Sequence, residues 1–210
     1  MSLNQKSAAK RADRIKVSPL VLPLAVKVAE AHAEVGLAQF NALQGAIANE
    51  ANQNDATRLL VRTQHAIPAG TSMTLALELF LKICHFQHHG VFPRGHDLVA
   101  ITQGLSQNCL EILRRRYTEF RASQPIFRAA IYELGLNAPT PKTSAAGNEE
   151  PDSFDTALAK ANGAYQAWRY FYESLSAKCV TVDFRQLLAL IEAAHKAVES
   201  HKGTARITVG

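Results

Sequence analysis

Aromatic and basic side chains gather most densely in the run WRYFYE and the residues just before it. Tyr165, Trp168 and Tyr172 fall on one face of a predicted helix, and Arg169 and Glu173 are four residues apart, the spacing of a helix ion pair. Rings of this kind bury large areas at core edges and interfaces, and an arginine beside them can bind a phosphate or a carboxylate. These residues therefore form either one wall of a helical bundle or a ligand-binding or dimer surface.

A second group of candidates is a basic stripe in which Arg114, Arg121 and Arg128 recur every seven residues. If one helix carried all three, they would line one face, and Arg115 and Arg116 would widen it into a track for a phosphate backbone. We take Arg114, Arg115 and Arg121 as candidates for contact with nucleic acid. The alternative is an ordinary solvated basic face, because neighbouring glutamates dilute the charge.

Histidine and cysteine side chains could hold a metal ion, and His85 and His89 stand four residues apart on one helical face. No carboxylate or thiolate at a recognised spacing completes such a set, and histidines near a helix C-terminus also interact favourably with the helix dipole. Cys84, Cys109 and Cys179 lie far apart without a CxxC pair, which predicts buried thiols. We predict no metal and no cofactor.

Helices must position these candidates, because apolar residues recur at helical spacing through most of the chain and no strand pattern is evident. The first predicted helix, residues 21–51, carries two adjoining apolar stripes. One consists of Leu24, Val28, Ala31, Val35, Ala38 and Ala42, and the other contains Phe40, Leu43 and Ile47. The sequence thus predicts an all-α fold, an antiparallel helical bundle of about six to seven helices.

Capping residues, prolines and glycines predict where the helices begin and end. The segments expected to be helical are a short one that ends before Pro68, one from Thr71 or Ser72 to Gly90, and residues 98–105, 106–122, 125–135, 154–175 and 181–200. Their expected caps are Asn54 or Asp55, His96 and Asp97, Asp152 or Ser153, and Thr181 or Asp183.

The stretch from Thr71 to Leu105 resembles the helix pair of a HEPN domain, a small α-helical fold of prokaryotic defence and toxin–antitoxin proteins. Glu78 and Lys82 stand four apart, and a glycine turn leads to the helix start Gly95-His96-Asp97-Leu98. The resemblance implies a HEPN-like bundle that pairs as a homodimer across its helices. It also implies, as a partner, RNA, a nucleotide, or a protein such as a nucleotidyltransferase-type antitoxin.

HEPN nucleases carry an arginine and a histidine, with four to six residues between them, on a late helix. Here that helix has Arg169, but positions 174 to 176 hold no histidine. The sequence therefore predicts a non-catalytic binding or interaction protein. The alternative is a metal-independent HEPN ribonuclease in which Arg169 holds the phosphate and His96, or His65 from a partner chain, acts as general acid or base.

Composition and charge limit the remaining possibilities. The chain is 47% hydrophobic and 20% charged, and residues 19–200 suffice for a single domain. Five basic residues and one acidic residue fall in the first sixteen, so residues 1–18 are expected to be a basic tail, residues 136–153 a mobile loop and residues 201–210 a second tail. No uninterrupted apolar run of membrane-spanning length occurs, and we expect a cytoplasmic protein without membrane contact.

Overall fold

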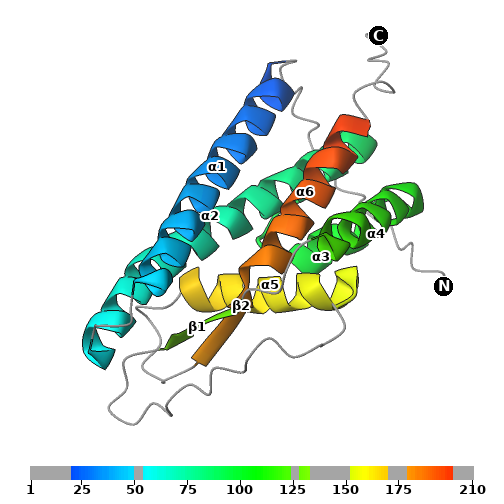
Figure 1. The fold of residues 1–210 in the computed structure, drawn as a ribbon. Helices are drawn as coiled ribbons and strands as arrows, with labels where there is room; N and C mark the ends of the chain where they lie inside the picture. The colour runs from blue at the N-terminus through cyan, green and yellow to red at the C-terminus, as the bar shows by residue number, and fades with distance from the viewer. Residues whose placement is uncertain (1–19, 50–53, 124–127, 133–151, 170–178, 201–210) are drawn as a thin grey trace, which may run out of the picture.

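The computed structural model describes residues 20–49, 54–123, 128–132, 152–169 and 179–200, and shows the predicted all-α helical bundle (Figure 1). The helices of this part of the chain are α1 (Val21–Ala48), α2 (Asp55–His89), α3 (Leu98–Gln103), α4 (Gln107–Ala122), α5 (Phe154–Arg169) and α6 (Phe184–Ser200). Two short strands, β1 (Arg128–Tyr132) and β2 (Cys179–Asp183), accompany them. The predicted tails and residues 136–151 of the predicted loop lie outside the described residues.

The two longest of the described helices, α1 and α2, pack against each other as an antiparallel pair (Figure 1). They approach closely at Gly36, where a Cβ atom would lie 2.6 Å from the Met73 side chain, 3.0 Å from the Met73 backbone nitrogen and 3.3 Å from the Ala69 carbonyl oxygen. Further along, His65 Nδ1 lies 3.2 Å from Gln39 Oε1. A hydrogen in place of a side chain at Gly36 thus allows the two backbones to come together.

Helix α2 corrects the predicted break at Pro68. Asp55–His89 is one helix with Pro68 inside it, so Thr71 and Ser72 are mid-helix residues and cap nothing. A proline inside a helix removes one backbone hydrogen bond and costs about 3 kcal/mol. Here Ala66, Ala69 and other residues on both sides of the proline are buried in the core, and this packing overrides the local signal.

The other helices complete a core that lies along α2. Helix α6 packs against both α2 and α4, and α5 crosses near the end of the bundle where the strands lie (Figure 1). The Phe40 ring of α1 stacks on Phe184 of α6 with centroids 5.3 Å apart, and both side chains are fully buried. Ten of the seventeen residues of α6 are buried, so this helix belongs largely to the core.

The strands correct a second prediction, the helix expected over residues 125–135. Arg128–Tyr132 is instead β1, which pairs antiparallel with β2 in a register that sets Arg128 opposite Asp183. The partner strand lies about fifty residues further along the chain, so the spacing of neighbouring residues could not reveal it. Residues 128–132 are a strand because their backbone pairs with that distant segment.

Several predicted helix caps are confirmed by their hydrogen bonds. Asn54 accepts from Thr57 N at 2.8 Å and Ser153 from Thr156 N at 3.2 Å. Ser106, which the sequence marked only as the first residue of a helix, accepts from Cys109 N at 3.3 Å and caps α4. Asp183 Oδ1 accepts from the Gln186 backbone nitrogen at 3.0 Å and begins α6. Gly90 ends α2 with a φ of 69°, a left-handed conformation that glycine adopts without strain.

One described segment, Leu60–His89 of α2, is long and apolar enough to cross a membrane by length and composition alone. Within its most apolar stretch of 18 residues, 61% is buried inside the fold. A buried core helix meets the same criteria, so the segment is weak evidence for a membrane span.

Two glycines of α1 offer a test of the close approach. Gly36→Ala should destabilise the fold by about 1 to 3 kcal/mol, because its methyl group meets the Met73 and Ala69 backbones of α2. Gly45→Ala is the matched control, because nothing lies within 4 Å of its Cβ. It should stabilise the helix by about 0.5 to 1 kcal/mol. Urea unfolding followed by circular dichroism measures both, and equal shifts in the two variants would contradict this account of Gly36.

Candidate functional site

A buried carboxylate, Glu78 of α2, organises the predicted helix-pair joint. Its side chain is only 2% exposed and lies 2.7 Å from Lys82 Nζ, which confirms the predicted ion pair. The same carboxylate lies 2.9 Å and 3.1 Å from His96 Nδ1, in the turn between α2 and α3. His96 is 51% exposed, so the site joins one buried acid to one accessible imidazole.

Asp97 and Asn162 fasten this turn to α5. Asp97 Oδ1 accepts from the Ala100 backbone nitrogen at 3.0 Å and so caps α3, the role that the sequence had divided between His96 and Asp97. Asn162 donates to the same oxygen at 3.3 Å and accepts from the Leu98 backbone nitrogen at 3.0 Å. The imidazole of His96 is therefore held by Glu78 and performs no cap.

The predicted aromatic site lies only partly within the described residues. Tyr165 is 6% exposed and belongs to the core. Trp168 and Arg169 form the last turn of α5, two helical turns beyond Asn162, and their side chains lie outside the described part. Tyr172 and Glu173 also lie outside it. Burial of Tyr165 favours the alternative role, one wall of the bundle, for that residue. The interface role of the other four residues remains a prediction.

Such an arrangement of carboxylate and imidazole can do acid–base chemistry. When Nδ1 carries the hydrogen that faces Glu78, Nε2 has a lone pair and can accept a proton from a bound molecule. The carboxylate fixes the orientation of the ring, because the side chain of Glu78 is buried and already paired with Lys82. Sequence reasoning missed the Glu78–His96 contact, since the two residues are eighteen apart and no local pattern links them.

The other histidines of this region hold the end of α2 to the following turns. His85 Nδ1 lies 3.0 Å from the Val91 carbonyl oxygen and His89 Nε2 lies 2.8 Å from that of Gly104. His88 Nε2 lies 3.3 Å from Ser106 Oγ. Among the residues that the structure describes, no three histidine, cysteine or acidic side chains are placed to bind a metal ion.

The predicted basic stripe is engaged with acidic partners. Arg114 makes two hydrogen bonds of 3.1 Å to Asp155 of α5. Arg115 and Arg116 lie 3.9 Å and 2.8 Å from Glu119. All three are partly exposed, so the structure leaves Arg114 and Arg115 as surface residues whose charge is partly neutralised.

Arg121 requires a correction. Its side chain is 4% exposed and lies 3.2 Å from Asp183, so it is a buried structural residue and cannot present itself to a nucleic acid in this fold. Arg128 lies on β1 rather than on the helix of Arg114. Arg114 is therefore on the surface, Arg121 in the interior and Arg128 on a strand. The three arginines form no continuous basic track.

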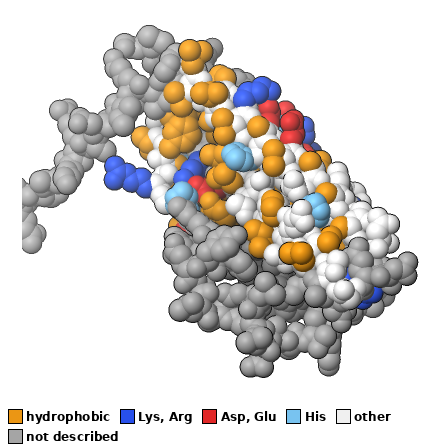
Figure 2. Space-filling view, turned by 90° about the vertical axis from the view of Figure 1, so that its left-hand side faces the viewer, with side chains coloured by type: hydrophobic (Ala, Val, Ile, Leu, Met, Phe, Trp, Pro, Cys, Tyr) orange, Lys and Arg blue, Asp and Glu red, His pale blue; other side chains and the backbone are white. Residues whose placement is uncertain are grey.

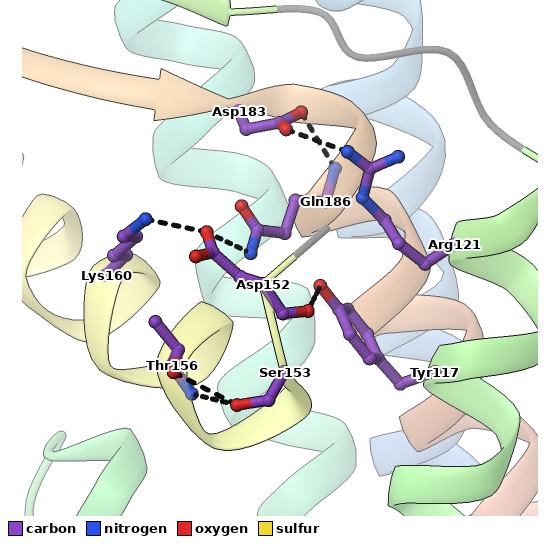
Figure 3. A network of polar contacts seen from close by, with 8 residues as sticks. All are labelled: Tyr117, Arg121, Asp152, Ser153, Thr156, Lys160, Asp183 and Gln186. Carbon is purple, nitrogen blue, oxygen red and sulfur yellow. Dashed lines mark hydrogen bonds and ion pairs between the residues drawn. The ribbon is translucent and has the colours of Figure 1, made fainter. Parts of the chain in front are cut away.

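Polar groups around Arg121 form a network that joins α4, α5 and α6 (Figure 3). Asp152, just before α5, accepts at Oδ2 from Lys160 Nζ at 2.7 Å and from Gln186 Nε2 at 2.9 Å. The Tyr117 hydroxyl donates to the Asp152 carbonyl oxygen at 3.1 Å. The sequence indicated Asp152 only as an alternative cap, yet three helices converge on it.

Burial shifts the pKa of two groups in the interior. The pKa of Tyr117 is raised, chiefly because burial disfavours the charged phenolate. The pKa of Cys84 is raised well above its usual value by its hydrogen bond with Cys109 and by burial. Both cysteines are free and buried, which confirms the prediction for these two; the side chain of Cys179 lies outside the described part.

An exposed apolar line along α1 is the other candidate site. We define the α1 stripe as Val21, Leu24, Val28, Ala31, Val35 and Ala38, all of which are exposed. The adjoining stripe with Phe40 and Leu43 is buried against the bundle. Figure 2 views the left-hand side of Figure 1, where α1 lies, and shows hydrophobic side chains over much of the described surface.

Comparisons with known proteins return no match: no family model, no curated protein and no solved structure is significantly similar to this chain. The resemblance to HEPN domains consequently remains a prediction from the residues of the helix-pair joint.

Tyr117 gives a testable dependence of stability on pH. Because the folded state raises the pKa of its phenol, the unfolded chain loses this proton first, near pH 10. The stability that Tyr117 contributes is therefore complete below about pH 10 and is lost as the pH rises through the folded-state pKa. Tyr117→Phe should lower stability at pH 7 by about 1 kcal/mol, through the lost hydrogen bond, and make the decline above about pH 10 shallower.

The measurement is urea unfolding of both chains between about pH 7 and pH 11. Titration of lysines contributes equally to both curves, so their difference isolates Tyr117. Parallel curves for the two chains would contradict the assignment.

Proposed function

We propose that this chain is a non-catalytic interaction protein that binds a protein partner through the α1 stripe. The observation that supports the proposal most strongly is the exposure of Leu24, Val28 and Val35, at 64%, 41% and 52%, along a face of α1 that the bundle does not cover. Single exposed apolar side chains are ordinary, but a continuous line of them along one helix marks an interaction surface.

The distribution of polar groups favours a protein over a nucleic acid as the partner. Nucleic-acid binding depends on cationic side chains that are available to phosphates. Of the three arginines predicted for that role, Arg121 is buried, Arg114 is bound to Asp155 and Arg115 lies near Glu119. The HEPN resemblance implies a nucleotidyltransferase-type protein as one such protein partner.

Photo-crosslinking in living cells tests the proposal. A benzophenone amino acid in place of Ala31, within the α1 stripe, should give protein adducts on irradiation. The same group in place of Leu37 is the matched control, because Leu37 is 41% exposed on α1 but lies off the stripe. It should give few adducts. No adduct from position 31, or equal adducts from both positions, would refute the α1 stripe as the docking surface.

A second candidate function, a metal-independent ribonuclease, is favoured by the Glu78–His96 contact. A half-exposed imidazole held by a buried carboxylate is suited to take a proton from a ribose 2′-hydroxyl. That oxygen then attacks the adjacent phosphorus and forms a 2′,3′-cyclic phosphate, and the 5′-oxygen leaves with a proton taken from water. Arg169 follows Asn162 by two turns on the helix that touches the turn of His96, and would bind the phosphate.

Incubation with mixed RNA tests this candidate. The native chain should cleave, and His96→Ala and Arg169→Ala should each lower the rate about a hundredfold or more. His32→Ala on α1, away from the joint, is the control and should keep full activity. Absence of cleavage by the native chain would eliminate the candidate, and equal cleavage by all four proteins would refute both assigned roles.

A further inference from the structure

We infer that the partner of the α1 stripe is the α1 stripe of a second copy of this chain, packed antiparallel to the first. The inference rests on the proposed function, because it names the partner for the same surface. Three observations carry it: the spacing of the stripe, the charges that flank it, and the sizes of the side chains that would meet.

The α1 stripe has the spacing of a coiled-coil seam. Its members follow one another at alternating intervals of three and four residues from Val21 to Ala38. Valines occupy every first position of this repeat, and leucine or alanine occupies every second. A strict seven-residue repeat keeps one narrow line facing a partner helix along its whole length. The buried stripe of α1 already serves the bundle, so this second line is available to another helix.

Charges beside the stripe select the antiparallel orientation. Lys27 and Glu34 occupy equivalent positions one heptad apart on the same flank, and the Lys27 side chain is 78% exposed. In an antiparallel pair, equivalent flanking positions face each other, so Lys27 of each copy lies near Glu34 of the other. Lys27 also lies 2.6 Å from Glu30 of its own helix, and that contact is compatible with a second acidic neighbour.

The same charges select one register. When Lys27 faces Glu34 of the second copy, Val28 meets Ala31, Val21 meets Ala38 and Leu24 meets Val35. Large side chains then oppose small ones in four of the six layers, which lets the helices interdigitate. A shift by one heptad would place Glu34 opposite Glu34, where like charges repel.

The size of this contact predicts a reversible dimer. Residues 21–38 extend about 27 Å along the helix, and a strip about 10 Å wide covers a few hundred Å² per copy. Standard stable interfaces bury about 800 Å² per partner. The pair should therefore dissociate with a Kd on the order of micromolar to tens of micromolar.

Charge reversal in the purified full chain tests the inference by sedimentation equilibrium. Lys27→Glu and Glu34→Lys should each raise the dimer Kd about tenfold, because both cross-pairs become repulsive. The double variant K27E/E34K should restore the native Kd. Val35→Glu should abolish dimerisation, whereas the off-stripe Leu37→Glu should leave it unchanged. Circular dichroism confirms that each variant is folded.

Disulfide trapping tests the orientation. A mixture of Leu24→Cys and Val35→Cys chains should form a crosslinked dimer on mild oxidation, and Leu24→Cys alone should form little. The native chain, with its three cysteines, sets the background. Predominant crosslinking of Leu24→Cys with itself would overturn the antiparallel arrangement.

The outcomes separate this inference from the function on which it rests. A chain that stays monomeric at about 100 µM, yet gives in-cell adducts from position 31 with a different protein, overturns self-pairing and leaves the interaction function standing. A monomeric chain without any adduct overturns both.

Discussion

The close approach of α1 to α2 at Gly36 is the constraint on which the rest of the bundle depends. Only glycine leaves room there for the Met73 and Ala69 backbones. Helix α1 contacts α2 on both sides of Pro68, at His65 before it and at Ala69 and Met73 after it, and α2 is one helix from Asp55 to His89. Helices α3, α5 and α6 then pack along it. The core is organised around a helix that local signals alone would divide in two.

Two buried carboxylates organise the polar contacts around that core. Glu78 binds Lys82 and His96 at the joint between α2 and α3, and Asp183 binds Arg121 while it caps α6. A charged group in the interior must be paired and hydrogen-bonded, and removal of one partner of such a pair typically costs about 3 to 5 kcal/mol. His96 and Arg121, which the sequence marked as candidates for function, are thus bound by these two carboxylates in the fold.

The surface offers two features that the stability of the bundle does not explain. The α1 stripe is apolar and faces away from the core, although burial of such side chains is the main favourable term in folding. His96 keeps half of its surface exposed although its Nδ1 is held from within. The stripe supports the proposal of a protein partner, and the imidazole supports the second, catalytic candidate. The basic residues support neither strongly, because acidic neighbours engage them.

The sequence by itself determined the all-α class, most helix caps, the Glu78–Lys82 pair and the two stripes of α1, because each depends on residues within one or two helical turns. It could not determine the continuity of α2 through Pro68, the strand at Arg128–Tyr132 or the burial of Arg121. Nor could it show which α1 stripe faces the core or that His96 meets Glu78. These depend on partners eighteen or more residues away along the chain, and only packing in three dimensions brings such groups together.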